Sequence, residues 1–431
     1  MRTRVYGWLA IVGLVVGIAP PVFSQTAPLT GWNVKASPYN ATGNGTTPDT
    51  AAFNSIISAC PAAGCRIYVP DGTYVITATL NIPAGKSVSF IGESKKNTAL
   101  VASGIASGQP VISYNGTSGS RIDSVEIRNL AIFGGTIANG VSLSWVLKST
   151  IDNVLFSTMN HAVVCSNSFT NTFSNNNTYS LLGDAYRLST DCNNNTILGG
   201  AFGSAQNGVH VVGSINALTV LGSNCEDVST SGYCVFLEPP SGARVEGVTV
   251  QGTHFERVRG AALFANGVDA DSVVNLKFDN NFVAGGYRDA FGQAAGLASY
   301  AVILRNAVGF EANNNIFYDW QNAAFAPNGT ESNGSVEHNQ LLQPTGASSL
   351  TLTSPVFRPS VRLTNNATSV VGSASLPVGR QELFRSTSPN VGSCNVGDIT
   401  WNTAPALNAY AGWVCITAGS PGTWASFGLI Q

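Results

Sequence analysis

The sequence predicts an all-β protein: a right-handed parallel β-helix with an N-terminal capping helix and a small C-terminal β module. The main observation is a short apolar phrase that returns at a regular interval. Copies lie at residues 139–143, 161–165, 184–188 and 207–211, which are 22, 23 and 23 residues apart. A period in the twenties is typical of stacked coils, because one coil cannot bury its apolar face alone.

A second phrase lies half a coil away and alternates apolar and polar residues, which is the period of a strand with one buried face. Its copies contain an asparagine at the bend, where a left-handed backbone is tolerated. These asparagines are Asn129, Asn153, Asn280 and Asn314. With several short strands in each coil, the expected inward column of the first phrase is Val163, Tyr186, Val209 and Cys234.

The chain divides into five predicted segments. Residues 1–24 read as an export signal, with basic Arg2 and Arg4 before an apolar run and small residues at the cleavage position. The others are the cap and first coils at 25–124, the β-helix at 125–345, last strands and a linker at 346–378, and the β module at 379–431. We expect a secreted or periplasmic protein.

Composition limits the partners. Only 10% of residues are charged and the net charge is −2, which argues against nucleic acid or a membrane surface as the main partner. Eight cysteines in an exported chain favour disulfides over a metal site. Proximity in the chain suggests the pairs Cys60–Cys65, Cys165–Cys192, Cys225–Cys234 and Cys394–Cys415, although sequence alone does not fix the pairing.

A capping helix is predicted over residues 48–60, with Thr47 as its N-cap residue and Phe53, Ile56 and Ile57 on its apolar face. A helix that leads into the first coil covers the open end of a β-helix, which is otherwise an exposed apolar edge.

The runs at residues 43–53 and 67–74 resemble the entry segment of the pectate-lyase-like superfamily, in its rhamnogalacturonase/epimerase-like form. The chain departs from that pattern with Asn44 in place of an aspartate and Pro48 in place of the first of two aspartates. The resemblance implies a β-helix over about residues 30–340. It does not fix the reaction, because the superfamily includes glycosidases, lyases, epimerase-like proteins and tailspikes. The polygalacturonase signature is missing.

Two glutamates form the best candidate site. If Phe202, Cys225, Phe255 and Phe282 occupy one inward position on successive coils, the residues after Cys225 and Phe255, Glu226 and Glu256, point outward side by side. One strand spacing would separate them by about 5 Å. Carboxylates that close have diverging pKa values and suit the acid and nucleophile of a retaining glycosidase.

A structural explanation competes with the catalytic one. Arg257 and Arg259 could neutralise the pair as a surface network, and a register slip near Cys225–Cys234 would turn one glutamate to another face. We assign Asp227 to the catalytic group with the two glutamates.

Further residues are assigned to substrate binding. An insertion at 283–299 breaks the period and is typical of a loop that walls a binding groove. His210 and Arg187 form a second outward pair on adjacent coils, although an outward histidine is also typical of a solvated face. The predicted substrate-binding residues are His254, Arg257, Tyr287, Arg288, Asp289, Asp319, Trp320, His210 and Arg187.

The C-terminal segment contains Trp401, Trp413 and Trp424, which could contact carbohydrate, support subunit assembly or form the core of a tiny domain.

The function predicted is glycoside hydrolysis of a polysaccharide by Glu226 and Glu256, without a metal or cofactor. One alternative is β-elimination from a uronate polymer, with Arg257 as base and a cation such as Ca²⁺. The other is a non-catalytic adhesin or polysaccharide-binding protein. The oligomeric state stays open, and a trimer fits the pattern.

Overall fold

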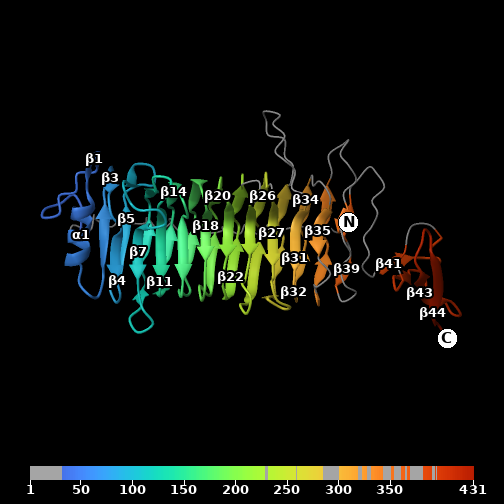
Figure 1. The fold of residues 1–431 in the computed structure, drawn as a ribbon. Helices are drawn as coiled ribbons and strands as arrows, with labels where there is room; N and C mark the ends of the chain where they lie inside the picture. Colours follow the sequence, from blue (N-terminus) through green and yellow to red (C-terminus); the bar gives the residue numbers. More distant parts are fainter. Residues whose placement is uncertain are drawn as a thin grey trace, which may run out of the picture.

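The computed structural model describes residues 32–431, and its strands stack into a parallel β-solenoid (Figure 1). The description omits residues 229–231, 259, 285–299, 319–322, 328–331, 343–350, 354–360, 365, 369–381, 391–393 and 395. The expected export signal therefore lies outside the described residues, as does most of the expected linker. Within the described ranges, no helix is both long and apolar enough to cross a bilayer.

Three long parallel sheets run along the solenoid, with 13, 14 and 11 strands among the described residues. Sheet 1 contains β1 (Asn44–Pro48), β3 (Gly72–Ile76), β6 (Thr98–Ala102), β10 (Ala131–Phe133), β14 (Leu155–Met159), β17 (Asn177–Leu181), β20 (Ala201–Gly203), β23 (Asn224–Glu226), β26 (His254–Glu256), β30 (Phe282–Ala284), β34 (Ile316–Tyr318), β37 (Gln340–Leu342) and β40 (Ala367–Thr368).

The other two sheets complete each coil. Sheet 2 contains β2 (Cys65–Val69), β5 (Val88–Gly92), β9 (Glu126–Arg128), β13 (Thr150–Asp152), β16 (Thr172–Ser174), β19 (Asn195–Leu198), β22 (Ile215–Leu221), β25 (Val245–Gln251), β28 (Val273–Val274), β29 (Lys277–Asp279), β32 (Ala307–Val308), β33 (Glu311–Asn313), β36 (Ser335–Glu337) and β39 (Arg362–Thr364). Sheet 3 contains β4 (Leu80–Pro83), β7 (Pro110–Asn115), β11 (Asn139–Ser144), β15 (Val163–Ser166), β18 (Asp184–Leu188), β21 (Asn207–Val211), β24 (Tyr233–Leu237), β27 (Ala261–Asn266), β31 (Tyr300–Arg305), β35 (Ala323–Pro327) and β38 (Thr351–Thr353). The short strands β8 (Ile122–Asp123) and β12 (Val146–Leu147) pair with each other.

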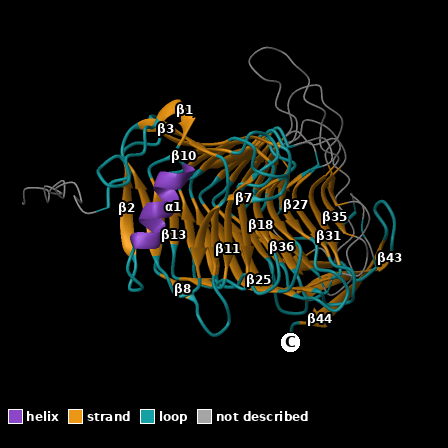
Figure 2. Cartoon of the chain, turned by 60° about the vertical axis from the view of Figure 1, so that its left-hand side comes forward, coloured by secondary structure: helices purple, strands orange, loops and turns teal. Residues whose placement is uncertain are grey.

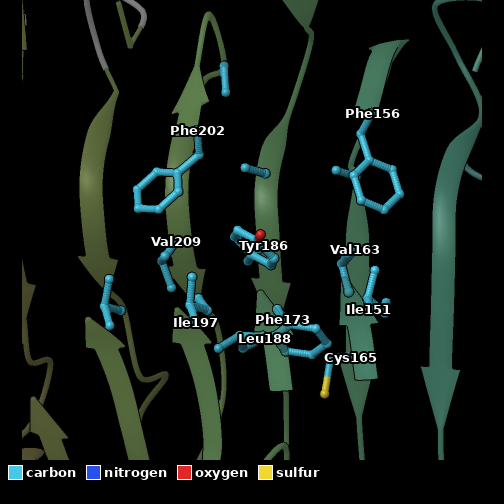
Figure 3. Close-up of a cluster of buried hydrophobic side chains, with 14 of the residues drawn as sticks. Ile151, Phe156, Val163, Cys165, Phe173, Tyr186, Leu188, Ile197, Phe202 and Val209 are labelled. Carbon is cyan, nitrogen blue, oxygen red and sulfur yellow. The ribbon is translucent and has the colours of Figure 1, made fainter. Parts of the chain in front are cut away.

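Matching residues of the repeated phrase stack in the core, which confirms the parallel β-helix. Val163, Tyr186 and Val209 are direct partners on successive strands of sheet 3 and lie inside the solenoid (Figure 3). The expectation that Cys234 continues this column was wrong, because Val235 pairs with Val209. Cys234 is also buried, but it forms a disulfide.

The bend asparagines adopt the left-handed backbone that the sequence predicts. Their φ angles are +56° at Asn129, +53° at Asn153, +56° at Asn280 and +57° at Asn314. Asn153 also donates from Nδ2 to Oδ1 of Asn129, at 2.9 Å. Other L side chains pay about 1–2 kcal/mol for this backbone, so the asparagines stabilise the sharp corner between sheets.

Replacing Asn153 by Ala is expected to lower the free energy of unfolding by about 1 kcal/mol, because alanine tolerates the left-handed backbone poorly. Asn153→Gly is the matched control, since it also loses the hydrogen bond but accepts the φ angle freely. The comparison uses denaturant midpoints. Equal losses in both variants would assign the effect to the hydrogen bond and not to the backbone.

The helix α1 (Thr50–Ala59) lies across one end of the stack (Figure 2) and buries Phe53, Ile56 and Ile57, as predicted. Its predicted start was wrong. Residues 44–48 form strand β1, and the N-cap residue is Asp49 and not Thr47. The Asp49 side chain does not cap the helix, because its two carboxylate oxygens accept hydrogen bonds from the preceding loop at Thr42 and Gly43.

All four predicted disulfides are present. The C-terminal module is a sheet of β41 (Glu382–Arg385), β42 (Ile399–Asn402), β43 (Tyr410–Thr417) and β44 (Thr423–Leu429), in which β42, β43 and β44 are antiparallel. None of Trp401, Trp413 and Trp424 is buried there. The interpretation of these tryptophans as the module core was therefore wrong, whereas the Cys394–Cys415 disulfide is buried.

Candidate active site

The two glutamates lie on neighbouring strands at the same position. Glu226 ends β23 and Glu256 ends β26, and the two are direct partners in sheet 1. The residues before them, Cys225 and Phe255, are fully buried and fix which face the glutamates take. Because adjacent strands lie about 4.8 Å apart, the carboxylates start from backbone positions one strand spacing apart.

Arg257, which follows Glu256, pairs with two acidic groups of the preceding coil. Its Nη2 donates to Oε2 of Glu226 at 3.1 Å and to Oδ2 of Asp227 at 2.8 Å. Asp227 and Arg257 follow the two glutamates and both have left-handed backbones, with φ of +54° and +50°. Because the backbone turns at the same position in both coils, the Arg257 side chain lies against Glu226 and Asp227 of the preceding coil. Among the described residues, no ion pair involves Glu256.

The predicted column beyond the glutamates is shifted by one residue. The strand β30 places Val283 in the core opposite Phe255, and Phe282 points outward opposite His254. The prediction of an inward Phe282 was wrong, because Phe282 and Val283 are both apolar and alternation does not distinguish them. Phe282 is 37% exposed and its ring lies 5.1 Å from that of His254.

Other predicted binding residues cannot be compared with the fold. Several predicted residues lie outside the described part of the chain: Tyr287, Arg288 and Asp289 with the rest of the inserted loop at 285–296, and also Asp319, Trp320 and Arg259. Their assignment to the site stays a prediction.

A hollow lies over the turns between sheets 1 and 3, next to the carboxylates. Its volume is about 300 Å³, and its lining residues are Leu181, Leu182, Ser204, Ala205, Gln206 and Asp227. We call it the turn hollow. Asp227 thus connects the hollow to the Arg257 ion pairs.

A second cluster surrounds Asp184, a residue that the sequence analysis did not identify. The side chain of Asp184 is 3% exposed, and its Oδ2 accepts from Nη1 of Arg187 at 2.9 Å and lies 3.1 Å from Nδ1 of His210. Its Oδ1 accepts from Nδ2 of Asn207 at 2.7 Å. The opposite ring nitrogen of His210, Nε2, lies 3.2 Å from Oε2 of Glu238. The buried carboxylate therefore joins groups from several coils.

The predicted pair Arg187 and His210 is adjacent, as the alternation indicates, with Nη1 of Arg187 3.3 Å from Nδ1 of His210. The alternative of a solvated histidine was wrong, since His210 is only 8% exposed. Its ring stacks on Phe236 with centroids 4.7 Å apart.

The sequence feature that could have identified Asp184 is its place as the first residue of a repeated phrase. These first residues are Asn139, His161, Asp184 and Asn207. The backbone N–H of His161 donates to Oδ1 of Asn139 at 3.2 Å, and that of Asp184 donates to Nδ1 of His161 at 2.9 Å. We call this set the first-position ladder. Because Nδ1 of neutral His161 accepts, its ring proton is assigned to Nε2.

The ladder shifts two pKa values. Burial lowers the pKa of His161, and the opposing effect of Asp184 is smaller. Burial alone would raise the pKa of Asp184, but the hydrogen bond and charge of His210, with Asn207 and His161, hold it below its usual range. The folded protein therefore favours a neutral His161 beside an ionised Asp184.

The free energy of unfolding is expected to fall as the pH drops through about 6.5, the ordinary pKa of histidine. In this range the unfolded chain binds a proton at His161 that the folded chain does not bind, so acid favours unfolding. The depressed pKa of Asp184 adds a further loss at lower pH. In His161→Gln, the denaturation midpoint should depend less on pH near about pH 6.5, while the further loss at lower pH stays. An unchanged slope in this variant would exclude His161 as the cause.

No three histidine, cysteine, aspartate or glutamate side chains are grouped as metal ligands within the described part of the chain. The Asp184 cluster is held together by contacts of the Asp184 carboxylate with Arg187, Asn207 and His210.

Comparisons with known proteins agree with the fold. Residues 32–233 match the family model described as rhamnogalacturonase A/epimerase, pectate lyase-like. A mutant tailspike protein of E. coli bacteriophage HK620, in complex with a hexasaccharide, is similar over 82% of this chain and 75% of its own, with a TM-score of 0.57 and 11% identity. The A-module of mannuronan C-5 epimerase AlgE6 from Azotobacter vinelandii is similar over 79% of this chain and 100% of its own, with a TM-score of 0.48 and 15% identity.

A curated relative covers a short segment. An 84-residue stretch is 33% identical to the non-secreted LysM effector LysM19 of Penicillium expansum, which is 18% of this chain and 7% of that protein. The match therefore concerns a small part of the relative's length.

Proposed function

Because the β-helix of this chain belongs to the pectate-lyase-like superfamily, we propose that the protein is an exported enzyme that cleaves a polysaccharide by glycoside hydrolysis. The observation that carries the proposal is the direct pairing of Glu226 with Glu256 on the outer side of sheet 1. The four disulfides support export to an oxidising compartment.

The contacts of Arg257 favour different roles for the two glutamates. Arg257 donates to Glu226, whereas among the described residues no ion pair involves Glu256, so we assign Glu226 as the nucleophile. Glu256 is then the acid that gives its proton to the glycosidic oxygen while Glu226 attacks the anomeric carbon. In the second step Glu256 takes a proton from water, which releases the sugar from Glu226. Asp227 holds Arg257 in place.

The same contacts disfavour β-elimination with Arg257 as the base. An arginine side chain only donates hydrogen bonds, and the Nη2 of Arg257 already donates to two carboxylates. Support for a polysaccharide substrate comes from the fold, since the similar tailspike was solved with a bound hexasaccharide. The chain's low charge also fits a neutral or weakly charged polymer.

The test is incubation of the purified protein with xylan, mixed-linkage β-glucan, α-glucan, polygalacturonate and alginate. New reducing ends without unsaturated products support hydrolysis. Unsaturated uronates, detected by their ultraviolet absorbance, would replace hydrolysis with elimination. Binding without any new ends would support the non-catalytic polysaccharide-binding function.

A further inference from the structure

An exposed aromatic ring lies on the same outward column as the carboxylate pair. Tyr179 is on β17, and the strand register aligns its neighbour Thr178 with Phe202 on β20. This places Tyr179 beside Gly203, which is the direct partner of Glu226. The column therefore runs from Tyr179 over Gly203 to Glu226 and Glu256.

The side chain of Tyr179 is largely exposed to solvent. It is 63% exposed, and Leu182, directly after the same strand, is 64% exposed and lines the turn hollow. Among the described residues, the Tyr179 side chain makes no ring contact or hydrogen bond of its own. A single exposed apolar group is ordinary on a protein surface. Here, however, the ring lies in the same column of outward strand positions as the proposed catalytic groups.

Gly203 lies between Tyr179 and Glu226 in this column, is buried, and has no side chain that would displace the glutamate. A Cβ at this position would lie 2.8 Å from the backbone oxygen of Glu226 and 3.3 Å from its Cγ. A larger residue would therefore press on the glutamate and fill the space between the carboxylate and the Tyr179 ring.

We infer that Tyr179 is a substrate-positioning residue on which a sugar ring stacks, so that the polysaccharide lies along the solenoid axis across successive coils of sheet 1. Two strand spacings, about 10 Å, separate Tyr179 from Glu226. The intervening part of the polymer passes over Gly203. A sugar presents apolar C–H groups to an aromatic face and keeps its hydroxyl groups in water, which a half-solvated tyrosine suits. The inference rests on the proposed function, because it assigns a subsite to the same catalytic pair.

The test compares Tyr179→Ala with Tyr179→Phe, which keeps the ring and removes only the hydroxyl. Leu198→Ala is the matched control, since Leu198 is 40% exposed but lies on sheet 2. Tyr179→Ala is expected to raise KM about tenfold on the polymer that the wild-type protein cleaves, with kcat nearly unchanged. Tyr179→Phe and Leu198→Ala should behave as wild type.

Binding is measured separately, by affinity gel electrophoresis against the same five polymers with Glu256→Gln as the background. Loss of binding on adding Tyr179→Ala, with retention in Tyr179→Phe, supports the subsite even if no polymer is cleaved. In that case only the hydrolytic function fails. Normal cleavage and binding by Tyr179→Ala, equal losses in both Tyr179 variants, or no binding of any polymer by the parent would overturn the inference.

Discussion

Replacing Glu256 by Gln is expected to lower kcat by about 10²–10⁴-fold, because the amide cannot give a proton to the leaving oxygen. Glu226→Gln should be at least as damaging, since it removes the proposed nucleophile. Both side chains lie on the outer side of a strand whose inner residue is fully buried, so the core is not altered. The initial rate of reducing-end formation is the measurement.

The control for charge is Glu246→Gln, a partly exposed glutamate on β25 in sheet 2. It should keep full activity. Glu256→Gln should also keep or raise the thermal midpoint, because neighbouring like charges on adjacent strands repel. Full activity in both Glu226→Gln and Glu256→Gln would move the chemistry away from this pair.

Replacing Asp184 by Ala is expected to reduce the free energy of unfolding by about 3–5 kcal/mol, the range for removing one partner of a buried ion pair. The carboxylate is nearly inaccessible and accepts from Arg187 and Asn207 while it contacts His210. Without it, these donors lose their buried partner. Urea denaturation followed by circular dichroism measures the change.

Two further variants separate the causes. Asp184→Asn should cost less than Asp184→Ala, because its amide oxygen can still accept from Asn207. The half-exposed Asp123, replaced by Ala, should change stability little. A loss below about 1 kcal/mol in Asp184→Ala would show that the buried carboxylate does not hold the coils together.

The fold could be predicted because the sequence repeat has the length of one coil of the solenoid. Val163, Tyr186 and Val209 return at nearly constant spacing, and that spacing is the length of one coil. The partnership of Glu226 and Glu256 could be predicted for the same reason. Each follows a buried residue on a strand of the same length, so counting from Cys225 and Phe255 gives the correct face.

The errors arose where the pattern was ambiguous. At Cys234-Val235 and at Phe282-Val283, two neighbouring residues are apolar, and either could fill the core. In the structure Cys234 is held in the Cys225–Cys234 disulfide and Phe282 packs outward against His254, contacts between coils that the alternation does not encode. Asp184 was missed because the apolar repeat assigns no role to the polar residue that begins each phrase, while the structure uses such residues as acceptors for the next coil.

The first-position ladder also limits how such a chain can gain or lose length by recombination. Where His161, Asp184 and Tyr233 follow Asn139, His161 and Asn207, the acceptor side chain belongs to one coil and the backbone N–H to the next, and every residue except proline supplies that N–H. Between Asp184 and Asn207 the donor is instead the side-chain Nδ2 of Asn207. Excising residues 184–206 would bring Asn207 behind His161 and restore an equivalent bond. The excised piece would take Asp184 and Arg187 with it, and also Cys192, which would leave Cys165 without its disulfide partner. The backbone junctions therefore permit the exchange of whole coils, but a disulfide between two coils requires that both of its cysteines are kept or lost together.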